Sequence, residues 1–217
     1  MNITSKDLAK VIVFQNATED DLQLILKNSI IRSIEEGGFF FFQGDLANYF
    51  YIRTSGQTKL MQSNPNGQQV NLRTIYPWQM FGALGAVRKE ATYPATAQAL
   101  ENSSALAIES SFLHKMLETR PQIAFDLMTL MTTYIQEMQS RYRELATERV
   151  EQRVANALLR LAAQVGIRSE KETIIELSFS RQDVAEMTGT TLYTVSRLLS
   201  DWERKGVIET GRERIRI

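Results

Sequence analysis

The sequence predicts an α+β fold in which a strand-rich N-terminal part, a long helix and a small helical C-terminal part follow one another. Three observations predict it. Turn residues separate short alternating segments between Ile30 and Ile108, an apolar repeat with 3-4 spacing follows Pro121, and two short helical segments joined by a glycine-containing turn lie near the C-terminus. The expected boundaries are 1–120, 121–148 and 149–217.

The composition is that of a globular protein without a marked charge preference. Apolar residues make up 43% of the chain, which is enough for a core. Lys plus Arg and Asp plus Glu number 25 each, so bulk charge indicates neither a nucleic acid nor a membrane as partner. Cysteine is absent, which excludes disulfides, thiolate catalysis and cysteine-held iron–sulfur clusters. The chain has no apolar run of about 18 residues and starts without the apolar segment of a signal peptide, so we expect a cytoplasmic protein.

The N-terminal part begins with helices and continues with strands. Residues 5 to 29 predict short helices, because Thr18 has the form of an N-cap and is followed by acidic residues. Beyond Ile30, strands recur at intervals of about 8 to 12 residues, which is typical of a β-roll, a sandwich or a barrel. Asn66-Gly67 predicts a hairpin turn. The four phenylalanines at 39–42 are expected in a strand that contributes to the core.

The long helix opens at Pro121 and carries an apolar seam. Six residues follow the 3-4 spacing of coiled-coil a and d positions over nearly three heptads: Met128, Met131, Ile135, Met138, Tyr142 and Leu145. Gln136, Gln139, Arg141 and Arg143 occupy the opposite face. We therefore expect these six residues, the dimer seam, to pair with a second copy of the chain. Packing of the helix against its own domain is the alternative.

The C-terminal part has the spacing of a helix-turn-helix. "RVEQRVANALLRLAAQVG" predicts a helix that ends at Gly166. Ser180 and Asp183 then form a capping box, Gly189 ends that helix, and Thr190 or Thr191 caps the next. Apolar residues on the two helices face each other across a turn of about three residues. "VIETGRERIRI" predicts a two-stranded wing.

With these segments in place, the chain resembles the CRP/FNR family of bacterial transcription regulators along essentially its whole length. The resemblance lies in "FFFFQGD", "YFYIRTSG", "NPNGQQV" and "MFGALG", in the long helix, and most specifically in "FSRQDVAEMTGTTLYTVSRLLSDWERKGVI". It implies a jelly-roll-like N-terminal β-roll effector domain of the cyclic nucleotide-binding type, a dimerisation helix and a winged helix-turn-helix DNA-binding domain. The implied partners are a double-stranded inverted-repeat promoter site, a second copy of the chain and RNA polymerase, with no membrane.

The resemblance also indicates what the effector pocket lacks. In cyclic nucleotide-binding relatives, a Gly-Glu pair binds the ribose and an Arg-Ser pair binds the cyclic phosphate. This chain keeps the glycine but has alanine, tyrosine and proline at the other three positions, so a cyclic phosphate would lose its bidentate guanidinium partner. We therefore expect an effector other than cAMP. The candidate effector pocket comprises Gly82, Ala83, Leu84, Tyr93, Pro94 and Met138.

Other interpretations of the chain remain open. "YPATAQA" resembles the pocket segment of the nitric-oxide-responsive, haem-associated branch of the family, and His114 is the only histidine that could ligate a haem. The second alternative is an effector-binding module without DNA activity, and the third is a dimer that needs no ligand. Since the chain lacks a thiol, a GxGxxG motif and a P-loop, an enzyme is not expected.

The resemblance assigns the residues that contact DNA. Phosphate contacts fall on Arg181, Gln182, Thr191 and Thr194, and base contacts fall on Tyr193, Ser196 and Arg197. Residues 149–217 contain 12 Lys and Arg against 10 Asp and Glu, so binding must depend on where the donors lie more than on bulk charge. An arginine can bond O6 and N7 of a guanine together, whereas Tyr193 replaces the glutamate usual in the family. The wing arginines Arg212, Arg214 and Arg216 are expected to add backbone contacts.

Overall fold

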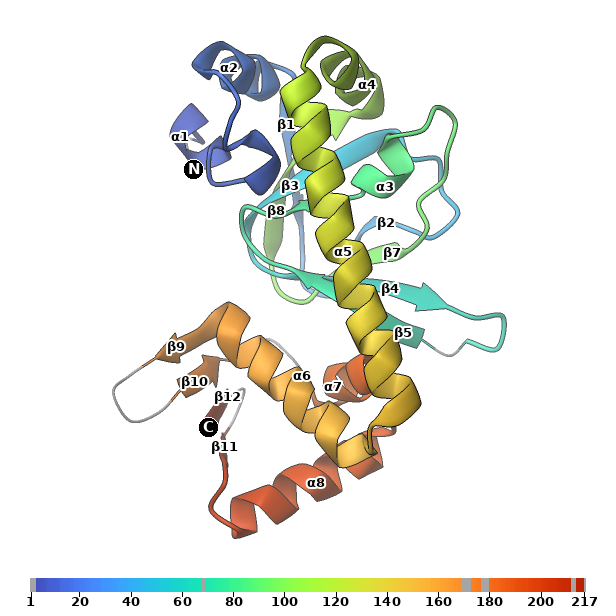
Figure 1. Cartoon of the computed structure of the whole chain (residues 1–217), viewed down its shortest axis with the longest axis vertical. Coiled ribbons are helices and arrows are strands. Elements are labelled where there is room, and N and C mark those ends of the chain that lie inside the picture. The colour runs from blue at the N-terminus through green and yellow to red at the C-terminus, as the bar shows by residue number, and fades with distance from the viewer. Residues whose placement is uncertain (1–2, 68, 169–172, 177–179, 212–213, 217) are drawn as a thin grey trace. The chain divides into compact units, whose positions relative to one another are not determined.

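The computed structural model describes residues 3–67, 69–168, 173–176, 180–211 and 214–216, and the predicted α+β class is confirmed (Figure 1). The chain divides into two compact units. The first comprises the chain up to residue 67 together with 72–137, and the second comprises 68–71 together with 138–217. In the described part of the chain, no helix is both long and apolar enough to span a membrane.

Short helices open the first unit, as predicted. They are α1 (Ser5–Leu8), the 3-10 helix η1 (Ile12–Phe14) and α2 (Glu19–Lys27). At the start of α2, the Thr18 hydroxyl accepts the Asp21 backbone N–H at 3.2 Å and donates to the Asp21 carboxylate at 2.7 Å. This reciprocal cap satisfies backbone donors that a helix N-terminus leaves without partners.

Two antiparallel sheets follow and form the β-roll. One has the order β1-β8-β3-β6, with bounds Ser29–Ile34, Ser103–Glu109, Tyr49–Ser55 and Met80–Phe81. The other has the order β2-β7-β4-β5, with bounds Phe39–Phe41, Thr96–Ala99, Thr58–Ser63 and Gln69–Ile75. Successive side chains of a strand point to opposite faces, so β3 contributes to two cores. Phe50 and Ile52 pack with the N-terminal helices, and Tyr51 faces the interior of the roll.

The phenylalanine run, expected in a strand that contributes to the core, divides between core and surface. Phe40 and Phe41 are buried in the roll interior. Phe39 and Phe42 are exposed and lie against each other with ring centroids 4.7 Å apart. The register of β2 against β7 shifts between Phe39 and Phe41, so two adjacent residues turn inward at that point.

Helices complete the first unit. The short helix α3 (Ala83–Ala86) follows β6, and α4 (Ser110–Thr119) leads into α5 (Pro121–Thr147), the long helix drawn in yellow in Figure 1. The first turns of α5 bury Ile123, Leu127 and Leu130 in the same core as the N-terminal helices. The long helix is therefore anchored on the β-roll through a stripe different from the dimer seam.

The second unit contains more strands than expected. Its helices are α6 (Val150–Val165), α7 (Arg181–Thr188) and α8 (Leu192–Arg204). The predicted wing, β11 (Glu209–Gly211) and β12 (Arg214–Arg216), belongs to a four-stranded sheet of order β11-β12-β10-β9. Strands β9 (Gly166–Arg168) and β10 (Thr173–Glu176) were not predicted, because a glycine such as Gly166 after a helical segment indicates only a helix stop. Arg212 lies outside the described residues.

The contact between Asp21 and Arg120 predicts a pH-dependent stability. Burial raises the pKa of Asp21, but hydrogen bonds from Arg120 (2.5 Å) and Thr18 outweigh burial and lower the pKa below its ordinary value of 3.8. A lowered pKa in the folded state stabilises the fold above pH 3.8, and this stabilisation is lost as the pH falls further. Asp21→Asn should lower the free energy of unfolding at pH 7 by roughly 1 to 2 kcal/mol, because it removes the negative charge that Arg120 contacts. Solvent screening keeps the effect this small, since Arg120 is partly exposed. The measurement is urea unfolding between pH 7 and pH 3.

The matched control is the exposed neighbour Asp20 on the same helix. Asp20→Asn should leave the stability curve close to that of the wild type. The curves of Asp21→Asn and wild type should converge below about pH 4. A constant difference across the whole pH range would contradict the charged role of Asp21.

Candidate nucleic-acid interface and effector pocket

Caps at three helix ends fix the geometry of the α7–turn–α8 segment. The Ser180 hydroxyl accepts the Asp183 backbone N–H at 3.1 Å and donates to the Asp183 carboxylate at 2.6 Å. Gly189 ends α7 with φ +61°, a left-handed conformation that favours glycine. Thr191 then caps α8 by accepting the Thr194 backbone N–H at 3.2 Å. The turn is therefore specified at both sides by local hydrogen bonds.

Packing and polar contacts fix these two helices on α6. Four residues at the centre are no more than 1% exposed: Val184, Ala185, Val195 and Leu199. Arg153 of α6 donates from Nε to the carbonyl of Thr188 at 3.0 Å. Trp202 of α8 donates from Nε1 to Glu151 of α6 at 3.1 Å. Both α7 and α8 are thus tied to α6 through side-chain hydrogen bonds as well as through the core.

The outer face of α8 presents the residues predicted to contact bases. Tyr193 is 76% exposed, Arg197 is exposed, and Ser196 lies between them on the same face at i+3. Within the described ranges, Arg197 makes no hydrogen bond or ion pair. An α-helix with donors on one face has the dimensions to enter the major groove of DNA.

The residues predicted to contact phosphates lie at the starts of α7 and α8. Arg181 and Gln182 occupy the exposed first turn of α7, and Gln182 donates to Glu186 at 3.1 Å. Thr191 and Thr194 share a hydroxyl–hydroxyl bond of 2.9 Å at the start of α8. Helix N-termini present free backbone N–H groups and a positive dipole end, which favour anions. All seven predicted residues therefore lie on one helix pair.

The wing is joined to α8 by a carboxylate that the sequence pattern does not single out. Glu203 accepts the Thr210 backbone N–H at 2.9 Å and the Thr210 hydroxyl at 2.8 Å. These two hydrogen bonds are the main reason that the pKa of Glu203 is lowered. In the wing itself, Arg216 pairs with Glu209 at 3.2 Å, and the Arg214 side chain lies outside the described residues.

In the β-roll, Tyr93 fills the place where the resemblance has a phosphate-binding arginine. Its side chain is 3% exposed, and its ring stacks on Phe41 with centroids 3.7 Å apart. Its hydroxyl donates to the Tyr49 carbonyl at 2.6 Å and accepts the Tyr49 N–H at 3.2 Å. Burial raises the pKa of the Tyr93 phenol. Gly82, with φ +75°, lies so close that a Cβ there would be 3.3 Å from both Phe41 and Tyr93.

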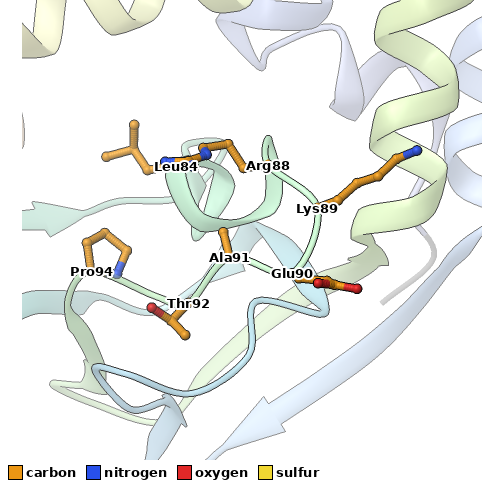
Figure 2. Close-up of a pocket in the computed structure, with 7 residues that line it drawn as sticks. All are labelled: Leu84, Arg88, Lys89, Glu90, Ala91, Thr92 and Pro94. Carbon is orange, nitrogen blue, oxygen red and sulfur yellow. The ribbon is translucent and has the colours of Figure 1, made fainter.

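Two of the remaining predicted pocket residues line a pocket on the surface of the roll. Ala83 is buried, whereas Leu84 is 60% exposed and Pro94 is exposed. Leu84 and Pro94 line a surface pocket of about 520 Å³ with Arg88, Lys89, Glu90, Ala91 and Thr92 (Figure 2). Met138 belongs to the second unit. The structure therefore separates the interior position of Tyr93 from the pocket on the outside of the roll.

One interior residue of the β-roll was not predicted from the sequence. Arg53 on β3 is fully buried, and its guanidinium lies over the rings of Phe40 and Phe81 at 4.6 and 5.1 Å. Burial lowers the pKa of Arg53 to about 9. The alternation of "YFYIRTS" places Arg53 on the same face as Tyr51, and this signal was available in the sequence.

The dimer seam on α5 is largely uncovered. Five of its residues are between 52% and 75% exposed: Met128, Ile135, Met138, Tyr142 and Leu145. Met131 is only partly buried and packs against the core of the first unit. Phe125 lies three residues before Met128, is 60% exposed, and was not predicted as part of this surface. An apolar row of this length on an exposed helix face indicates an interaction surface.

The structure describes two residues that the sequence associates with haem. His114 lies on α4, and its Nε2 atom is buried without a partner between core residues such as Leu113 and Met116. Tyr93, in the segment that resembles the haem-associated branch, uses its hydroxyl in bonds to Tyr49. No group of three metal-ligating side chains gathers in the described residues.

Comparison with known proteins matches both units. A model of the cyclic nucleotide-binding domain matches residues 31–120, and a model of the Crp-like helix-turn-helix domain matches residues 152–217. The anaerobic regulatory protein of Bacillus subtilis is 26% identical over 88% of this chain and 80% of its own length. The cyclic AMP receptor protein of Thermus thermophilus is 27% identical over 92% of this chain and 88% of its own. The structure of FixK2 from Bradyrhizobium japonicum superposes with a TM-score of 0.78 at 21% identity, covering 86% of this chain and 91% of that one.

Proposed function

The chain belongs to the CRP/FNR family of transcription regulators, and we propose that it is a homodimer that binds an inverted-repeat DNA site and responds to an effector other than cAMP. The family is one of DNA-binding regulators and not of enzymes. The observation that carries the proposal is the capped α7–turn–α8 pair, whose outer face presents Tyr193, Ser196 and Arg197 to solvent.

In this proposal α8 enters the major groove and α7 crosses the backbone. Arg181, Gln182, Thr191 and Thr194 contact phosphates and fix the register without selecting a sequence. Arg197 donates to O6 and N7 of a guanine, and Ser196 lies next to it. Tyr193 has no carboxylate to accept from cytosine N4, so we expect weaker discrimination at its base pair.

Dimerisation through the seam would place two recognition helices on one face of the DNA. The exposed apolar row from Met128 to Leu145 supports this pairing, because burial of such a row on a second helix removes apolar surface from water. Half-sites about one helical turn apart then match the two-fold symmetry of the dimer. The expected domain roles are 1–120 for the effector, 121–148 for dimerisation and 149–217 for DNA.

The stacked Tyr93 supports the exclusion of cAMP. A cyclic phosphate needs a charge-assisted partner, and at that position this chain has a phenol that is already bonded to Tyr49. The resemblance to the nitric-oxide-responsive branch rests on "YPATAQA", and in this chain Tyr93 and Ala95 of that segment are buried in the roll. That segment therefore supports packing, and haem-based sensing has no specific observation in its favour.

The seam predicts the oligomeric state. Ile135→Asp or Met138→Lys should convert the dimer to monomers and abolish specific DNA binding, because each places a charge in an apolar helix–helix contact. Sedimentation at micromolar concentration measures the mass. Gln136→Asp, which adds a charge on the same helix outside the seam, should remain dimeric. A wild-type monomer at that concentration would contradict the proposal.

The recognition helix predicts base specificity. Arg197→Ala should cost roughly 1 to 3 kcal/mol of binding free energy and relax the preference for one guanine in a TTG-like half-site. Arg181→Ala should instead weaken all sequences alike and reduce the salt slope by about one unit. Selection from randomised sites and gel shifts at two salt concentrations measure both effects. If Arg197→Ala selects the same motif as the wild type, the proposed register of α8 is wrong. If the wild type binds no promoter DNA, the alternative of an effector-binding module without DNA activity is favoured.

The roll interior predicts the response to cyclic nucleotides. Neither cAMP nor cGMP should bind or change DNA affinity, since Ala83, Tyr93 and Pro94 replace the carboxylate, guanidinium and hydroxyl of the binding motif. Titration calorimetry measures this, with the Thermus thermophilus cyclic AMP receptor protein as positive control. A Kd of micromolar or tighter for either nucleotide would overturn the assignment.

A further inference from the structure

Arg53 carries a buried guanidinium that is only half satisfied. Its side chain is fully buried on β3. Nη1 donates to the carbonyls of Ser55 at 3.4 Å and Ser104 at 3.5 Å, which are long hydrogen bonds. Nε and Nη2 have no partner, and within the described residues Arg53 forms no ion pair. A buried cation without a counter-charge is rare in proteins and needs an explanation.

The surroundings stabilise the cation only in part. The rings of Phe40 and Phe81 face the guanidinium and attract positive charge, but they offer no lone pair to an N–H group. The negative charge of Glu101 partly offsets the effect of burial on the Arg53 pKa, but Glu101 forms no hydrogen bond with Arg53. With a pKa of about 9, Arg53 keeps its charge at neutral pH. The missing element is therefore an anion.

The two unpartnered nitrogens define the shape of that anion. Nε and Nη2 lie on the same edge of the planar guanidinium, the edge that forms two parallel bonds to the oxygens of a planar oxyanion. Nη1, on the other side, is already taken by carbonyls. A carboxylate or nitrate places two oxygens against this edge, whereas a spherical anion such as chloride has no pair of acceptor atoms to offer.

The strand register pairs Arg53 and a second buried polar residue with small side chains. Arg53 pairs with Ala105 on β8, and Thr58 on β4 pairs with Ala99 on β7. Both alanines belong to the roll interior, so Thr58 faces that interior from the opposite sheet. The Thr58 hydroxyl is fully buried and also lacks a partner. Two unpartnered polar groups thus face the interior of the roll, which aromatic side chains and alanines fill.

We propose that the Nε–Nη2 edge of Arg53 binds a small planar oxyanion, of the carboxylate or nitrate class, inside the β-roll, with the Thr58 hydroxyl as a further donor. The site differs from the cyclic phosphate position, which Tyr93 fills. Its role as an effector site rests on the proposed function, whereas anion binding itself does not require DNA and is tested without it.

Thermal unfolding of the full chain in sodium nitrate, formate or chloride at equal ionic strength tests the site. At about 100 times the Kd, nitrate or formate should raise the Tm by roughly 5 °C relative to chloride. A Tm that is equal in nitrate, formate and chloride would overturn the proposal.

Variants assign the effect to Arg53. Arg53→Leu keeps the apolar contacts with Phe40 and Phe81 and should abolish the difference between planar anions and chloride. Arg53→Lys keeps the charge without the two-nitrogen edge and should lose the preference for planar anions, so it decides the outcome if Arg53→Leu does not fold. Arg88→Gln, at an exposed arginine that lines the surface pocket outside the roll, is the matched control and should respond as the wild type does.

The anion effect is measured independently of DNA binding. If planar anions still stabilise Arg53→Leu or Arg53→Lys, Arg53 is not their site and the proposal fails. If wild-type DNA binding at the inverted repeat persists in chloride alone while the anion effect is absent, the proposed function stands and the anion site does not. If DNA binding is absent while the anion effect is intact, the anion site stands and the proposed function does not.

Discussion

Helix α5 carries two apolar stripes on one continuous run of 27 residues, and the rest of the structure depends on both being covered. One stripe, with Ile123, Leu127 and Leu130, packs into the core that holds the N-terminal helices to the β-roll. The other is the dimer seam, whose residues are mostly exposed in the single chain. A helix with apolar residues on two faces is stable in water only when both faces are buried. The exposed seam therefore indicates that α5 packs against a further apolar surface, just as the first stripe packs into the core.

The end of α5 belongs to the same compact unit as the helix-turn-helix. Glu144, 7% exposed, accepts two hydrogen bonds from Arg160 of α6 at 2.8 and 2.9 Å. Leu145, the last seam residue, lies so near the α7–α8 turn that a Cβ on Gly189 would be 3.0 Å from its Cδ2 atom. A residue of the seam thus borders the turn that sets the recognition helix. A change in the packing of the seam would therefore move a side chain that lies next to this turn.

Local chemistry explains which features the sequence could predict. The caps at Ser180 and Thr191 and the seam spacing depend on residues three or four apart, so the α7–α8 pair and the long helix were predicted correctly. Strands β9 and β10 are short, and β10 pairs with β12 of the wing, a contact between distant segments that no local signal specifies. The side chains of both Phe40 and Phe41 point inward because the register of β2 against β7 shifts there, and a local sequence pattern does not specify this shift either. The loss of the phosphate-binding arginine was evident in the sequence, but the stacking of Tyr93 on Phe41 required the fold.

Two arginines of the β-roll differ in how far groups of the protein satisfy them. Arg73 on β5 lies over the ring of Tyr134 at 3.8 Å and pairs with Glu137 at 3.4 Å, so protein side chains alone tie this strand to α5. Arg53, deeper in the roll, has aromatic faces but no acceptor for one edge. A ligand shifts a conformational equilibrium only through a difference in its affinity for the two states. Side chains of the protein satisfy Arg73, whereas the proposed anion would add to the edge of Arg53 hydrogen bonds that no group of the described residues supplies.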